Sequence, residues 1–172
     1  MPVLLPQQIA PSTPAQAELT ERWLTPLGEA LDAYCRTLRA ETDTVLAPQL
    51  SSAAGKPYPY GRCEEITQHL YGRLQERLRQ PAHPVELALQ GFVAAGGLLR
   101  SVWGVLREQY FQNALQMGTL YVDVSNDTVV VTKPPVEILP MEASGLVAVR
   151  DLAHFRQTAE RYWAATLYAN HL

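Results

Sequence analysis

Apolar residues recur every three or four positions through the first half of the chain, the spacing that places them on one face of an α-helix. Thr13, Pro14 and Gln16 give the first such segment an N-cap, a proline at the first helical position and a capping-box glutamine. We therefore expect a helix from Pro14, kinked or restarted at Pro26 because proline lacks the amide that a helix interior needs. Its apolar stripe consists of Leu24, Leu27, Leu31, Tyr34 and Leu38.

The same spacing predicts three further helices. One extends from Arg62 to Gln80, and another begins at Pro84, because proline is favoured at the first helical position. A third is expected after Gly96 and Gly97, ending near Gly118. Its inward residues are Leu99, Val102, Trp103, Leu106 and Tyr110.

The pattern changes to β-branched runs late in the chain. Thr119–Val124 and Thr128–Thr132 are separated by Ser125-Asn126-Asp127, which predicts a hairpin over about 119–132. Val136–Leu139 and Leu146–Val149 favour one or two more short strands, and Asp151 caps a C-terminal helix that covers the sheet. The expected fold class is α+β: mainly helical, with a small late antiparallel sheet.

Length and proline content predict the domain organisation. Pro2, Pro6 and Pro11 fall in residues 1–13, which have no apolar period, so we expect an extended proline-rich arm there. Residues 14–172 are expected to form a single globular domain, since 172 residues suit one core.

Composition narrows the classes of function. The chain is 47% hydrophobic with 14 basic and 17 acidic residues, a balance that argues against disorder and against nucleic-acid binding. Gly91–Leu99 is the longest stretch without strongly polar residues, far short of the ~20 apolar residues of a membrane span. The N-terminus has no basic region of a secretory signal, so we expect a cytoplasmic protein with Cys35 and Cys63 reduced.

Cys63 is the residue most suggestive of chemistry. A thiol in the first turn of a helix, beside Arg62, meets conditions that favour the thiolate, whereas its place on the apolar stripe is typical of a core cysteine. A cysteine that starts a helix after a Pro-x-Gly turn, as in Pro59–Leu70, resembles the layout of papain-like and transglutaminase-like thiol enzymes.

The resemblance implies a histidine on a later strand, with a carboxylate or amide behind it. The strand at Thr119–Val124 supplies Asp123 but no histidine, and Gln112 and Asn113 before it cannot act as a base. As a hypothesis, the catalytic set would be Cys63 as nucleophile, His154 as base and Asp123 as its orienting carboxylate.

No other motif indicates a cofactor or a metal. The four histidines have no metal-ligand spacing, and neither cysteine belongs to a C-x-x-C pair. The glycines of Gly91–Gly97 match neither the dinucleotide fingerprint nor the phosphate loop. We therefore expect no cofactor and no metal.

The predicted function is that of a small accessory or protein-interaction domain without its own catalysis, which binds a protein partner or a second copy of itself. The candidate partner-binding residues lie in segments with no amphipathic face of their own. They are Val3, Leu4, Leu5, Tyr58 and Tyr60. Two alternatives stay open: a thiol-dependent hydrolase or acyl/amide transferase, and a small-molecule binding module.

Overall fold

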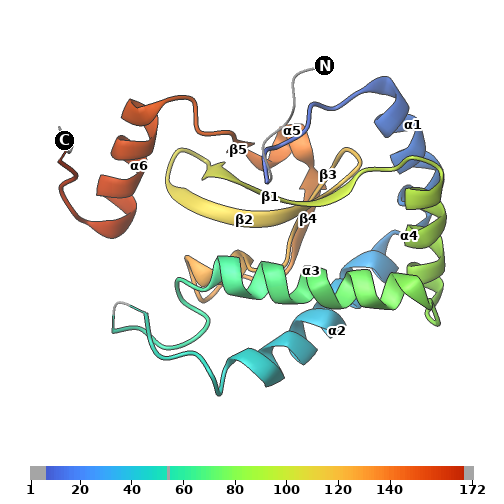
Figure 1. The fold of residues 1–172 in the computed structure, drawn as a ribbon, viewed down its shortest axis with the longest axis horizontal. Coiled ribbons are helices and arrows are strands. Elements are labelled where there is room, and N and C mark those ends of the chain that lie inside the picture. The colour runs from blue at the N-terminus through green and yellow to red at the C-terminus, as the bar shows by residue number, and fades with distance from the viewer. Residues whose placement is uncertain (1–6, 54, 169–172) are drawn as a thin grey trace.

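The computed structural model describes residues 7–53 and 55–168, which form six α-helices and a five-stranded antiparallel sheet (Figure 1). The helices are α1 (Pro14–Trp23), α2 (Glu29–Leu46), α3 (Cys63–Arg79), α4 (Pro84–Ala94), α5 (Met141–Ser144) and α6 (Leu152–Trp163). The strands are β1 (Leu99–Leu106), β2 (Tyr110–Met117), β3 (Leu120–Asp123), β4 (Glu137–Pro140) and β5 (Leu146–Val147), in the order β4-β3-β2-β1-β5. The α+β class is confirmed, but the sheet is larger than a late hairpin with one or two added strands.

The helix boundaries follow the capping signals of the sequence. The Thr13 hydroxyl accepts a hydrogen bond from the Gln16 amide at 3.2 Å, and Pro84 occupies the first turn of α4. A 3₁₀ turn at Thr25–Leu27 separates α1 from α2, so Pro26 interrupts the helix as expected. The side chain of Gln16 does not complete a capping box. It donates to the carbonyl of Gly96 and accepts the amide of Leu98, and so connects α1 to the start of β1.

The helix expected from Leu99 to Gly118 is wrong, because this segment forms the β1–β2 hairpin. Val102 and Leu106 pack on one face of the sheet, while Trp103 and Val105 pack on the other. With both faces covered, apolar residues occur on both sides of the strand and the alternation that reveals a half-buried strand is lost. The remaining spacing then matches a helical template by coincidence.

The expected hairpin over 119–132 is also wrong in part. Only Leu120–Asp123 forms a strand, which pairs with β2 and with β4, and the chain then enters a 3₁₀ turn at Asn126–Thr128. The Asp123 carboxylate accepts the backbone amide of Ser125, and the Thr128 hydroxyl donates to the Ser125 carbonyl. Such local side-chain bonds compete with ladder pairing, so the β-branched run after Thr128 stays outside the sheet. The short strands expected near 136–139 and 146–149 are confirmed as β4 and β5.

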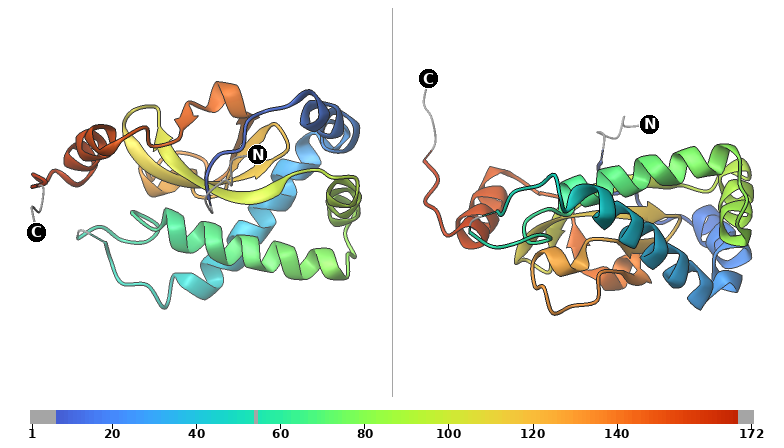
Figure 2. Two further views of the ribbon diagram at one scale, coloured as in Figure 1. Left: turned by 45° about the horizontal axis from the view of Figure 1, so that its top comes forward. Right: turned by 90° about the horizontal axis from the view of Figure 1, so that it is seen from below.

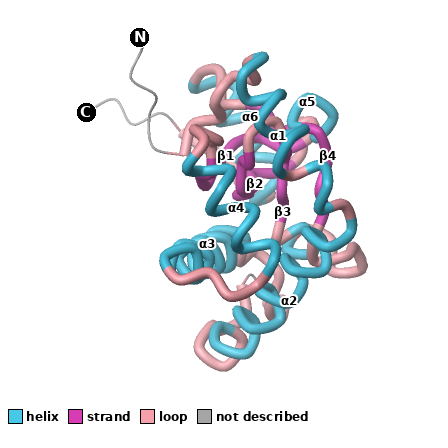
Figure 3. Tube along the Cα trace, turned by 90° about the vertical axis from the view of Figure 1, so that its right-hand side faces the viewer, coloured by secondary structure: helices cyan, strands magenta, loops and turns pink. Residues whose placement is uncertain are grey.

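The two faces of the sheet have different covers. Helices α1–α4 and their core pack on Leu115, Met117 and Val122, while α5 packs on the opposite face with Val102 and Tyr121. The strands lie between the α2–α3 layer and α5 (Figure 3). One end of the sheet is bounded by α1 and α4, and the other end by α6 (Figure 2).

Residues 7–10 of the expected arm pack against the sheet, whereas residues 11–13 are exposed. Ile9 contacts the cluster around Val102, and the Gln116 side chain holds both the amide and the carbonyl of Ala10 at 2.9 Å. The Trp103 amide donates to the Gln7 carbonyl at 2.8 Å. These contacts make the described part of the arm one structural unit with β1 and β2. The candidate docking residues Val3, Leu4 and Leu5 lie outside the described residues.

The expected C-terminal helix is confirmed as α6, capped by the Asp151 carboxylate, which accepts the His154 amide at 2.7 Å. Its residues Phe155 and Ala159 pack on Phe111 and Val105. Phe111 and Leu115 lie on the same face of β2, so α6 and the α3–α4 layer cover different parts of one sheet face. Within the described part of the chain, every helix is too short or too polar to cross a bilayer.

Candidate functional site

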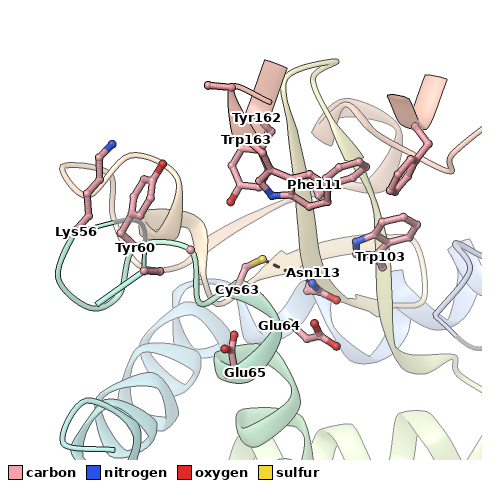
Figure 4. Close-up of a pocket in the computed structure, with 14 residues that line it drawn as sticks. Lys56, Tyr60, Cys63, Glu64, Glu65, Trp103, Phe111, Asn113, Tyr162 and Trp163 are labelled. Atoms are coloured by element: carbon pink, nitrogen blue, oxygen red, sulfur yellow. Dashed lines mark hydrogen bonds between the residues drawn. The ribbon is translucent and has the colours of Figure 1, made fainter. Parts of the chain in front are cut away.

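A cavity of about 740 Å³ lies between the N-terminal end of α3 and α6 (Figure 4). Its floor is the sheet, where Trp103 of β1 and Asn113 of β2 are register partners and Phe111 follows on the same face. The rest of the lining comes from the α2–α3 loop, the first turn of α3 and both ends of α6. These residues are Ala53, Lys56, Tyr60, Gly61, Cys63, Glu64, Glu65, Phe155, Tyr162, Trp163 and Ala164.

Cys63 begins α3 at the centre of this pocket and is only 9% exposed. The side-chain amide of Asn113 donates to its sulfur at 3.6 Å. Burial raises the pKa of the Cys63 thiol, and the hydrogen bond from Asn113, which acts in the opposite direction, does not offset it. The group at the centre of the pocket is therefore a neutral thiol at neutral pH.

The first turn of α3 is fixed from three sides. Arg62 forms an ion pair with Glu65 at 2.7 Å and donates to the carbonyl of Ser51 at 2.7 Å. The amide of Gly61 donates to the carbonyl of Thr128 at 2.9 Å, which fastens the α2–α3 loop to the segment after β3. These contacts set the position of Cys63 against the sheet.

Aromatic rings form the upper wall of the pocket. The Phe111 ring stacks on Trp103 at 5.4 Å between centroids and contacts Phe155 at 5.1 Å and Trp163 at 5.5 Å. Trp163 is 54% exposed at the rim. Burial raises the pKa of Tyr162, so its hydroxyl stays protonated across the neutral range. The wall therefore offers an extensive apolar surface edged by uncharged polar groups.

Asp123 projects from the opposite face of the sheet. Its carboxylate accepts hydrogen bonds from Gln112 at 2.8 Å, Tyr121 at 2.7 Å and the Ser125 amide at 2.7 Å. Burial raises its pKa to about 6, although these hydrogen bonds act in the opposite direction. The Ser125 hydroxyl lies within hydrogen-bond distance of both the Asp123 carboxylate and the Asn113 carbonyl. Asp123 is therefore connected to Asn113 indirectly, through Ser125.

His154 lies in the first turn of α6 and is buried. Its Nδ1 accepts the Arg150 amide at 3.2 Å, and its Nε2 lies 3.1 Å from the Glu108 carboxylate. In the part of the chain that the structure describes, neither His154 nor Asp123 hydrogen-bonds to Cys63. The structure thus brings Asn113, rather than either of the two other residues of the hypothesised set, to the thiol.

The two candidate docking tyrosines have different environments. The Tyr58 hydroxyl donates to the Asp43 carboxylate, which also accepts from the buried guanidinium of Arg39, so Tyr58 belongs to an internal polar network. Tyr60 lines the pocket, with the Lys56 ammonium 4.1 Å from its ring centroid.

No sequence pattern indicates that Trp103, Phe111 and Asn113 share a site. Their spacing resembled a helix, in which Trp103 and Phe111 appeared as packing residues and Asn113 had no partner. Only the β1–β2 register places Trp103 opposite Asn113. A correct strand assignment for residues 99–117 would have been the one signal able to find the site.

Comparisons with known proteins add no relatives. No family model matches the chain, and neither the curated proteins nor the solved structures gave a match. Among residues 7–53 and 55–168, no group of three or more His, Cys, Asp or Glu side chains could hold a metal ion. The functional argument therefore depends on the pocket itself.

Proposed function

We propose that this chain is a protein-interaction domain without catalysis of its own, and that its docking site is the aromatic pocket around Cys63. The observation that carries the proposal is the pairing of Cys63 with Asn113. A thiol becomes a nucleophile when an adjacent base takes its proton or its pKa is depressed. An amide cannot take a proton, and the pKa of this thiol is raised.

The walls of the pocket support a docking role. Aromatic side chains that present a large rigid surface are the residues most enriched at the centres of protein interfaces. Trp163 keeps half of its surface exposed at the rim, where a bound segment would cover it. The partner under this proposal is a segment of another protein or of a second copy of this chain.

A reducing compartment fits the same proposal. Both Cys35 and Cys63 are free thiols, although each is buried in a helix. Free cysteines are typical of cytoplasmic proteins, and this supports our proposal that the protein acts in the cytoplasm.

Peptide selection tests the docking site. A phage-displayed library of random peptides is selected on the immobilised protein, and enriched peptides are synthesised and titrated by calorimetry. Trp163→Ala should weaken their binding at least about tenfold, because a bound segment would cover the exposed half of the indole, and the loss of such an aromatic contact costs about 1.4 kcal/mol or more. Tyr168→Ala is the matched control, because Tyr168 is 88% exposed and does not line the pocket. Enrichment of no peptide, or of peptides that bind Trp163→Ala equally well, would overturn the proposed site.

Alkylation tests the absence of catalysis. Cys63 should react with iodoacetamide at pH 7 more slowly than free cysteine, because it is a buried neutral thiol. Faster reaction would contradict the proposal and favour the thiol-dependent hydrolase or transferase. Thermal stabilisation by a metabolite, lost in Trp163→Ala, would favour the small-molecule module instead.

A further inference from the structure

The charged groups around the pocket are unevenly distributed between its two ends. At the loop end, Lys56 lies over the ring of Tyr60, and both are on one side of Cys63 in Figure 4. Trp103 is on the other side. Glu64, the next residue of α3, lines the pocket and forms no hydrogen bond or ion pair with any described residue. The Lys56 ammonium at one end contacts the ring of Tyr60, whereas the Glu64 carboxylate has no partner among the described residues.

Contacts between α3 and β1 place Glu64 at the Trp103 end. Gln68 follows Glu64 by one turn on the same face of α3, and its amide donates to the Ser101 hydroxyl at 3.4 Å. Ser101 and Trp103 lie on the same face of β1, two residues apart. Cys63 contacts Asn113, the register partner of Trp103. Glu64 precedes Gln68 by one turn of α3. It therefore lies over the part of β1 that contains Trp103.

Asn113 contributes an acceptor without a partner at the same end. The residue as a whole is 4% exposed, and its side-chain nitrogen donates to the sulfur of Cys63. Its side-chain oxygen accepts no hydrogen bond from any described residue and points away from the sulfur (Figure 4). This oxygen is not sealed from solvent, so a donor of a ligand in the pocket can reach it in place of water.

We infer that the Glu64–Trp103–Asn113 end of the pocket binds a positively charged side chain, lysine or arginine, carried by the partner segment. The inference rests on the proposed function and names the chemistry of the partner. A cationic side chain supplies donors for Asn113, a charge for Glu64 and a cation for the indole face of Trp103. Repulsion from Lys56 directs that charge to this end and sets the orientation of the segment.

The start of α3 offers the strongest argument for a negatively charged ligand instead. The first turn of α3 lines the pocket, and the amides without intrahelical partners and the positive end of the helix dipole at such a terminus favour an anion. However, Glu64 and Glu65 lie in that turn and already supply negative charge, and Arg62 is paired with Glu65 at 2.7 Å. An anionic ligand at the Trp103 end would also meet the Glu64 carboxylate.

Blocked tripeptides with a variable central residue test the inference. The probes carry arginine, lysine, citrulline, norleucine or glutamate between two glycines, with the termini acetylated and amidated. Binding is followed by NMR through the indole signals of Trp103 and Trp163. Trp23 is the internal reference, because it packs against Gly91 of α4, outside the pocket.

The arginine and lysine probes should bind about tenfold more tightly than citrulline and norleucine, as expected for a cation over an indole beside a carboxylate. Glu64→Gln should remove most of this preference. Glu76→Gln should leave it intact, since Glu76 is exposed on the same helix and does not line the pocket.

The outcomes separate this inference from the proposed function. Equal binding of charged and neutral probes would overturn the inference and leave the docking pocket standing. Tightest binding of the glutamate probe would overturn it in favour of an anion at the start of α3. If no probe shifts the two indole signals at millimolar concentration, the inference fails, and the peptide selection above decides the proposed function independently.

Discussion

The contact between Cys63 and Asn113 allows a direct test of whether the neighbour of the thiol controls its reactivity. In Asn113→His, an imidazole replaces the amide that donates to the Cys63 sulfur at 3.6 Å. The ring can accept the thiol proton, which the amide cannot, and the products are a thiolate and an imidazolium. We therefore expect Cys63 in this variant to become reactive at neutral pH.

The separation of the two groups sets the size of the effect. Opposite charges about 4 Å apart at an effective dielectric constant of about 20 attract by about 4 kcal/mol, which corresponds to about a thousandfold in acid dissociation. Water in the pocket reduces this attraction, so we expect the rate of Cys63 alkylation at pH 7 to rise about 100-fold.

The assay measures iodoacetamide incorporation at Cys63 by mass spectrometry between pH 5 and pH 9. Cys35 is the internal control, because burial, with a smaller contribution from the charge of Asp32, raises the pKa of its thiol to about 12. Asn113→Leu removes the hydrogen bond without adding a base, and Asn113→Asp adds a negative charge that should slow alkylation further. A folded Asn113→His protein that reacts no faster than Asn113→Leu would refute the reasoning.

Three further predictions concern the buried polar groups that support the sheet. Burial raises the pKa of Asp123 from 3.8 to about 6, so the folded state keeps a proton that the unfolded state loses as pH rises from about 4 to 6. Relative to Asp123→Asn, the wild type should lose about 3 kcal/mol of unfolding free energy between about pH 3 and pH 7, measured by urea unfolding. Arg39→Met should cost about 3 kcal/mol, because it removes the partner of Asp127 at 2.8 Å. Gln116→Leu should cost about 2–4 kcal/mol, because it leaves the amide and carbonyl of Ala10 without partners.

Each of these predictions has a matched control. For Asp123→Asn, a difference from the wild type that does not change with pH would contradict the raised pKa. Arg36→Met removes a neighbouring ion pair with Asp32 that is largely exposed, so its cost should stay below about 1 kcal/mol. Equal losses of unfolding free energy in Arg36→Met and Arg39→Met would show that burial does not determine the cost of losing the Arg39–Asp127 ion pair. Gln16→Leu, which removes a half-buried amide, should cost less than Gln116→Leu, whose amide is fully buried, and the reverse order would contradict the role given to Ala10.

Local signals determined the helices. Thr13, Pro26 and Asp151 act on backbone groups within a few residues of themselves, so their effects could be inferred without the rest of the fold. The amphipathic stripe of α3 likewise needs only helical spacing to place Cys63 and Ile66 on one face. The short strands near the prolines Pro135 and Pro140 were also predictable.

The central hairpin was not predictable from the same kind of signal. Both faces of β1 and β2 are buried, one against α3 and α6 and the other against α5 and residues 7–10. A strand covered on both faces loses its alternation, and Leu99–Leu106 then satisfies a helical template as well. Local hydrogen bonds at Asp123 and Ser125 likewise ended β3 where β-branched residues suggested a longer hairpin.

The α+β class, most helix boundaries and the position of Cys63 at the start of a helix can be inferred from the amino-acid sequence alone, because each depends on contacts within a few residues along the chain. The tertiary structure decided what Cys63 faces. Pairing of β1 with β2 brings Trp103 and Asn113 together, and the packing of α6 adds the aromatic wall. A site assembled from segments up to a hundred residues apart follows from strand register and helix packing, which no local pattern encodes.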